Sequence, residues 1–128
     1  MSWRVLLIAV VIFGRGSPWA NAQEPYWVVG DGGLTCGQFL RAAGDEQKIR
    51  PPNAARNMLY APSFISFSAW ADGYLTRGNL DDGTARNIGK TVDRATRVDW
   101  LQTWCHGNPQ SNYADALFAL REELRRRP

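Results

Sequence analysis

The chain has 128 residues, enough for one small domain and little more, because a domain needs on the order of 100 residues to bury a useful core. Its 15 basic and 12 acidic side chains give a net charge of +3, and three arginines form the terminal run Arg125–Arg127. Nucleic-acid binders carry a basic stripe across the fold rather than a basic tail, so this charge pattern argues against nucleic acid as a partner.

Residues 1–22 have the pattern of a secretory signal peptide. A cationic start at Arg4 precedes nine uninterrupted apolar residues, 5–13, and Ala20-Asn21-Ala22 predicts cleavage after Ala22. The alternative is a retained membrane anchor, but nine residues rise only about 14 Å as a helix, whereas a bilayer core is roughly 30 Å thick. We therefore expect a periplasmic or secreted protein without a membrane segment after cleavage. Since two arginines leave with the signal peptide, 13 basic and 12 acidic side chains would remain.

The chain contains two cysteines, Cys36 and Cys105. In an exported protein of this size they predict one disulfide, because the periplasm and the extracellular space are oxidising. Closing a loop of about 70 residues would stabilise the fold by roughly 4 kcal/mol in the chain-entropy model. The alternative, two free buried thiols, is more typical of a cytosolic chain.

Residues 23–34 contain three glycines and a proline without a sustained period, which predicts an extended N-terminal arm with a turn at 31–33. The aromatic residues of the arm, Tyr26 and Trp27, are able to dock on the core.

The spacing of Thr35 and Gln38 matches a capping box, so a helix is expected from Cys36 to about residue 43, with Gly44 as its stop. Residues 45–62 are polar and interrupted by prolines, which favours a loop with at most a helical turn over 54–59. The acidic pair Asp45-Glu46 in this loop is expected to be solvated.

A broad apolar face at helical spacing predicts a central helix over residues 63–77, ended by Gly78. A second long surface loop is expected over 79–95. Thr96 is the expected cap of a third helix, which Gly107 closes.

Asn108 and Pro109 are typical of a cap and a first helical residue, so they predict the start of the last helix. This helix has a single apolar seam at helical spacing, formed by Tyr113, Ala116, Leu117, Leu120 and Leu124. The short connection predicts that the third and fourth helices are antiparallel or sharply angled. The sequence thus predicts an all-α domain over residues 35–128: a small bundle of four main helices with long loops and one disulfide.

No arrangement of residues indicates catalysis or a cofactor. His106 follows Cys105, but adjacent helical residues diverge by about 100°, and a cysteine in a disulfide is not a nucleophile. One histidine and two paired cysteines leave no zinc site, and no glycine-rich loop leads from a strand into a helix. We therefore expect a protein that is not an enzyme and has neither metal nor cofactor.

Tryptophan is unusually frequent, with six residues in 128. Trp70, Trp100 and Trp104 lie on apolar helix faces, where core packing is the first explanation. The alternative is that some are anchors for another protein, because aromatic side chains dominate interface hot spots. Together with Tyr74 they are the candidate protein-binding residues.

Three stretches carry a family resemblance: LTCGQFL at 34–40, WADGYL at 70–75, and WLQTWCHGNP at 100–109 running into YADAL at 113–117. In this order, and with the cysteines in these places, the sequence resembles the HdeA-like family of small periplasmic proteins over residues 34–120. The resemblance implies a helical domain with one disulfide joining two such segments. It also implies an acid-stress chaperone that loosens at low pH and presents apolar surface to unfolding proteins, as carboxylates become protonated.

The sequence departs from that family in a longer spacing between the cysteines, two extra loops, and an arginine tail in place of lysine-rich ends. The segment around Trp70 and the Cys-x-x-Asn-Pro stretch also resemble Tai-type immunity proteins, which bind and block a cell-wall amidase toxin. Both resemblances predict other proteins as partners, either unfolded clients or one specific partner, and leave a homodimer open.

Overall fold

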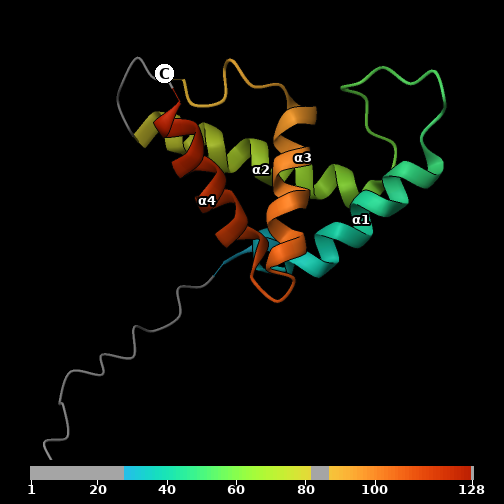
Figure 1. The fold of residues 1–128 in the computed structure, drawn as a ribbon, viewed down its shortest axis with the longest axis horizontal. Coiled ribbons are helices and arrows are strands. Elements are labelled where there is room, and N and C mark those ends of the chain that lie inside the picture. Colours follow the sequence, from blue (N-terminus) through green and yellow to red (C-terminus); the bar gives the residue numbers. More distant parts are fainter. Residues whose placement is uncertain (1–27, 82–86, 128) are drawn as a thin grey trace, which may run out of the picture.

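The computed structural model describes residues 28–81 and 87–127, which form a bundle of four α-helices (Figure 1). A 3-10 helix, η1 (Gly30–Gly33), precedes α1 (Cys36–Ile49), α2 (Pro62–Asp81), α3 (Arg94–Gly107) and α4 (Tyr113–Arg126). The all-α prediction is confirmed. The predicted signal peptide and the aromatic pair Tyr26-Trp27 lie outside the described residues.

The four helices are arranged around α2, which crosses the back of the view in Figure 1. There α3 and α4 lie in front of it and diverge from the short loop that joins them. α1 packs on α2 and α3, and η1 packs on α2 and α4. The predicted turn in the N-terminal arm therefore contacts both α2 and α4.

Three aromatic rings from three helices meet in the core. Phe39 of α1 lies 4.7 Å from Tyr113 of α4 and 5.6 Å from Phe67 of α2, measured between ring centroids. Phe67 and Tyr113 meet edge to face at 4.9 Å. Such pairs contribute about 0.5–1.5 kcal/mol each beyond burial. The predicted apolar seam of α4 is confirmed, since all five of its residues are buried.

A disulfide joins Cys36 and Cys105, as predicted, with a Cα–Cα distance of 5.0 Å and both residues completely buried. It ties the first turn of α1 to the last turn of α3. The capping box before α1 is also confirmed, because Gln38 N donates to Thr35 Oγ1 (3.3 Å) and Thr35 N donates to Gln38 Oε1 (2.8 Å). Thr35 forms an isolated antiparallel bridge with Asn112, so the starts of α1 and α4 are hydrogen-bonded to each other.

The predicted stop at Gly44 is wrong, because α1 continues to Ile49. Ala42, Ala43 and Glu46 are buried, so packing on both sides of the glycine keeps this segment helical. Residues 54–59 form no helical turn; hydrogen-bonded turns at 51–54 and 55–58 occupy the loop instead.

Gly78 does not end α2, which continues to Asp81. A Cβ at Gly78 would lie 2.8 Å from Arg121 Nε, so the glycine allows α2 and α4 to approach closely. α3 begins at Arg94 rather than after Thr96, because Asp93 is the cap and its carboxylate accepts from Thr96 N (2.8 Å).

The predicted start of the last helix at Asn108-Pro109 is also wrong. Asn112 caps α4 in a capping box with Asp115, and α4 begins at Tyr113. Asn108 instead caps the end of α3, where its side chain donates to Trp104 O (2.9 Å). Residues 108–112 are therefore the loop that turns the chain between the two helices.

Candidate functional site

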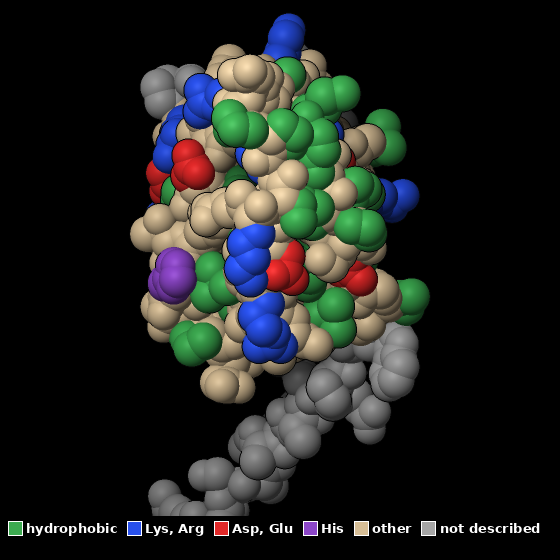
Figure 2. Space-filling view, turned by 90° about the vertical axis from the view of Figure 1, so that its right-hand side faces the viewer, with side chains coloured by type: hydrophobic (Ala, Val, Ile, Leu, Met, Phe, Trp, Pro, Cys, Tyr) green, Lys and Arg blue, Asp and Glu red, His purple; other side chains and the backbone are tan. Residues whose placement is uncertain are grey.

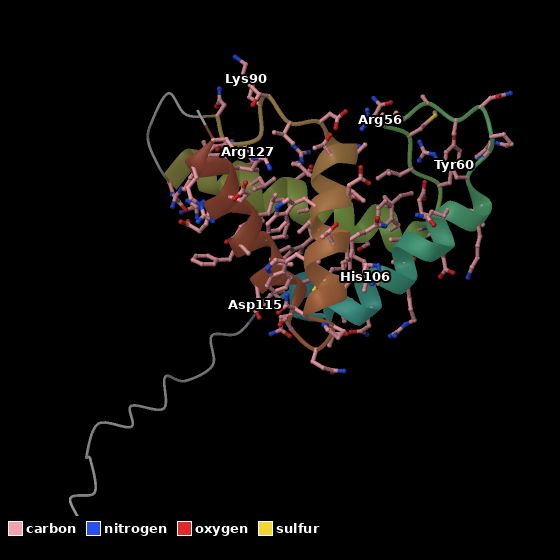
Figure 3. The ribbon with its side chains drawn as sticks, viewed as in Figure 1. Arg56, Tyr60, Lys90, His106, Asp115 and Arg127 are labelled. Atoms are coloured by element: carbon pink, nitrogen blue, oxygen red, sulfur yellow. A yellow bond between two sulfur atoms is a disulfide. The ribbon has the colours of Figure 1, made fainter. Side chains whose placement is uncertain are left out.

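A largely apolar groove opens between η1, α2 and α4 and encloses about 580 Å³. This volume lies within the range of small-ligand and side-chain pockets, roughly 300–1,000 Å³. Figure 3 shows Asp115 at the end of α4 that lies beside η1. We call this cavity the aromatic groove; its lining residues are Val28, Val29, Trp70, Tyr74, Ala114, Asp115 and Phe118.

Trp70 is held in place on three sides. Its indole Nε1 donates to the carbonyl oxygen of Val29 (3.0 Å), and its ring stacks on Tyr74, with 5.7 Å between centroids and 18° between planes. A Cβ at Gly32 would overlap the six-membered ring of Trp70, so η1 packs on the indole only because residue 32 is glycine. Trp70 is therefore a fixed wall of the groove.

The rims of the aromatic groove expose large apolar side chains. Val29 is 74% exposed on the η1 side and Phe118 is 58% exposed on α4, whereas Ala114, which also lines the groove, is buried. Exposed apolar side chains grouped around a cavity are typical of binding sites in soluble proteins. The lining thus suits an apolar or aromatic group, with the Asp115 carboxylate as its charged member.

The structure separates the four candidate protein-binding residues. Trp70 and Tyr74 line the aromatic groove together. Trp100 and Trp104 are partly buried on α3, where they pack against the hydrophobic core and are not part of the groove lining. The prediction missed Phe118, although a phenylalanine that falls outside the apolar seam of α4 is a signal that the sequence contains. It also missed Val28 and Val29, which reach the groove only through the fold of η1.

A second group of exposed apolar side chains lies at the other end of the molecule. Ile49, Met58 and Ile65 are 54%, 57% and 42% exposed, and they come from the end of α1, the 50–61 loop and the start of α2. Figure 2 shows this side, with hydrophobic side chains in its upper part among charged and polar ones. The aromatic groove is the stronger candidate because it combines such side chains with a cavity.

Glu46 is buried, so the expectation that it is solvated is wrong. Its carboxylate accepts from the backbone N–H groups of Tyr60 (2.8 Å) and Ala61 (2.7 Å) and from Arg50 Nη1 (3.2 Å). The same guanidinium donates to the carbonyl oxygens of Met58 (2.8 Å) and Ala55 (2.6 Å). Glu46 and Arg50 therefore pin both halves of the 50–61 loop to α1.

Asp72 of α2 binds two arginines of α3, with 2.7 Å to Arg94 Nη2 and 3.0 Å to Arg97 Nη2. Close by, burial raises the pKa of the Tyr113 phenol far above its usual range, and the Asp72 carboxylate adds to this effect. The phenol of Tyr113 therefore stays neutral at physiological pH. The two ion pairs of Asp72 join α2 to α3.

Among residues 28–81 and 87–127, no cluster of three His, Cys, Asp or Glu side chains is placed to bind a metal ion. His106 lies exposed at the end of α3 (Figure 3). None of the helices in the described part of the chain is long and apolar enough to span a membrane.

The chain matches no protein-family model, no curated protein and no solved structure.

Proposed function

We propose that this protein is an exported, non-enzymatic protein that binds other proteins, and that it holds their apolar segments in the aromatic groove as an acid-stress chaperone does. The observation that carries the proposal is a groove with an apolar lining whose rims, Val29 and Phe118, are exposed. The signal-peptide pattern, the disulfide and the resemblance to the HdeA-like family support a role outside the cytosol.

The size of the groove suits one or two inserted side chains. Burying a large apolar side chain contributes about 1.5–3 kcal/mol, and an aromatic pair with Trp70 or Tyr74 adds about 0.5–1.5 kcal/mol. A contact of this strength is weak and depends little on the sequence around the inserted residue. Such binding is what a chaperone needs to hold many different unfolding clients.

Release of the 50–61 loop would enlarge the apolar surface. The N–H groups of Tyr60 and Ala61 in this loop donate to the Glu46 carboxylate, and Arg50 forms an ion pair with it. Loss of these contacts would free the loop, which carries the exposed Met58, from α1. The freed loop would add a second apolar surface to the one that the groove supplies.

The test is light scattering of an aggregating client protein at pH 2–3 and at pH 7. The secreted protein is expected to suppress scattering at low pH, and Phe118→Ala is expected to reduce the suppression. Ile65→Ala is the matched control, because it truncates another exposed apolar helical residue away from the groove. Absence of suppression by the unaltered protein at low pH would remove the chaperone function.

The fixed position of Trp70 favours a second candidate, an immunity protein or inhibitor that blocks one specific partner such as a cell-wall hydrolase. A side chain that is already locked by a hydrogen bond and by stacking loses little entropy on binding, which favours affinity for one matched ligand. This function predicts a stoichiometric complex at neutral pH and inhibition of the hydrolase. If the purified protein forms no complex with hydrolases encoded beside its gene, this candidate fails.

A further inference from the structure

We propose that the aromatic groove is also an intramolecular docking site, and that its occupant is the aromatic pair Tyr26-Trp27 of the same chain. Docking of the pair would make the N-terminal arm a built-in competitor of any other protein that binds there. The inference does not require the proposed function, since it concerns what fills the groove when no other protein is present.

The position of the pair in the chain is the first argument. Val28 and Val29 are part of the groove lining, and Val29 is attached to the groove by the hydrogen bond from Trp70. Trp27 is the residue before Val28, and consecutive Cα atoms are about 3.8 Å apart. The pair therefore begins at the edge of the cavity without an intervening linker.

The chemistry of the pair is the second argument. Tyrosine and tryptophan each bury about 150–250 Å² in an apolar site and stack on other aromatic rings. The groove offers the rings of Trp70, Tyr74 and Phe118 and about 580 Å³. Docking would cover the two exposed rim residues, Val29 and Phe118, which otherwise remain in contact with water.

The tether is the third argument. A segment joined to its site by a short linker acts at an effective concentration in the millimolar range. A contact between the pair and the groove is therefore mostly formed even when its dissociation constant is only slightly below this concentration. A second protein has to compete with the docked pair for the groove. Pro25 narrows the backbone freedom of the segment just before the pair, which lowers the entropy lost on docking.

The experiment places a benzophenone amino acid at position 27 of the secreted, oxidised protein and maps the photo-crosslinks by mass spectrometry. The expected product is an intramolecular crosslink to Tyr74, Ala114 or Phe118. A crosslink between two copies, or none to the groove residues, would overturn the inference. Since no client is present, the result is independent of the light-scattering test.

A second measurement uses an apolar fluorescent dye as the probe of an open groove. Replacing both aromatics, Tyr26→Ala with Trp27→Ala, is expected to raise the affinity of the dye several-fold, and adding Phe118→Ala is expected to cancel the increase. Leu80→Ala is the control, because Leu80 is 71% exposed but does not line the groove. Unchanged dye binding in the double variant would contradict docking. Docking confirmed here together with failed client holding would leave this inference intact and remove the proposed function.

Discussion

Gly32→Ala should separate η1 from α2 and so destroy one wall of the aromatic groove. Gly32 is buried, and an added methyl group would overlap the six-membered ring of Trp70. Overpacking of this kind costs about 1–3 kcal/mol. Displacement of the indole also removes its hydrogen bond to Val29 O, which is worth about 0.5–1.5 kcal/mol. We expect the free energy of unfolding to fall by about 2–4 kcal/mol in total.

The assay is urea unfolding followed by far-UV circular dichroism, with near-UV spectra to report on the tryptophans. For a slope of about 2 kcal/mol per molar urea, the midpoint should fall by roughly 1–2 M. Gly73→Ala is the control, because Gly73 lies in the same helix as Trp70, is exposed, and has no neighbouring atom within 4 Å of an added Cβ. Helix propensity predicts that this substitution raises the free energy of unfolding by about 0.5–1 kcal/mol. An unchanged midpoint and near-UV spectrum for Gly32→Ala would refute the packing argument.

Three further outcomes follow from the contacts. Replacing the disulfide, Cys36→Ala with Cys105→Ala, should lower the free energy of unfolding by about 4 kcal/mol in denaturant titrations; a loss below about 1 kcal/mol would contradict the loop-closure argument. Glu46→Gln should cost about 2 kcal/mol and speed hydrogen exchange at the two amides that the carboxylate binds, and wild-type exchange there would contradict its role as a pin. Hydrogen bonds from Thr96 lower the pKa of Asp93, and the one from its side chain has a larger effect than the one from its backbone N–H. The stability that Asp93 adds is therefore present above its pKa in the unfolded chain and is lost as the pH falls through its lower pKa in the folded chain. Asp93→Asn should weaken the acid dependence of the free energy of unfolding between about pH 2 and 5. A pH profile identical to that of the unaltered protein would contradict this role of Asp93.

Several local features follow from short-range rules alone. The capping box of Thr35 and Gln38 forms as predicted, because both partners lie within one helical turn and need no other part of the fold. The apolar seam of α4 is buried as predicted, since residues three and four apart share one helix face whatever packs against it. The disulfide forms as predicted, and that prediction used only the cysteine count and the signal-peptide pattern.

The wrongly predicted helix boundaries have a common cause. A glycine or an asparagine is compatible with several positions in or beside a helix, and tertiary packing determines which of them it occupies. Gly44 and Gly78 are typical helix stops, yet packing of the flanking residues keeps Gly44 helical and the approach of α4 keeps Gly78 helical. Asn108 is a good N-cap, yet Asn112 pairs with the segment before α1 and takes that place. Glu46 looks solvated only if α1 ends before it.

The sequence by itself determined an all-α chain with one disulfide and an apolar seam in the last helix, because these depend on composition and on spacing within single elements. Only the tertiary structure decided that Gly32 of η1 packs on Trp70, that Phe118 and Val29 line the same groove as Trp70, and that a buried carboxylate holds the 50–61 loop. Each of these contacts joins residues from elements that are far apart in the chain. The spacing of residues within one element does not indicate which other element will pack against it.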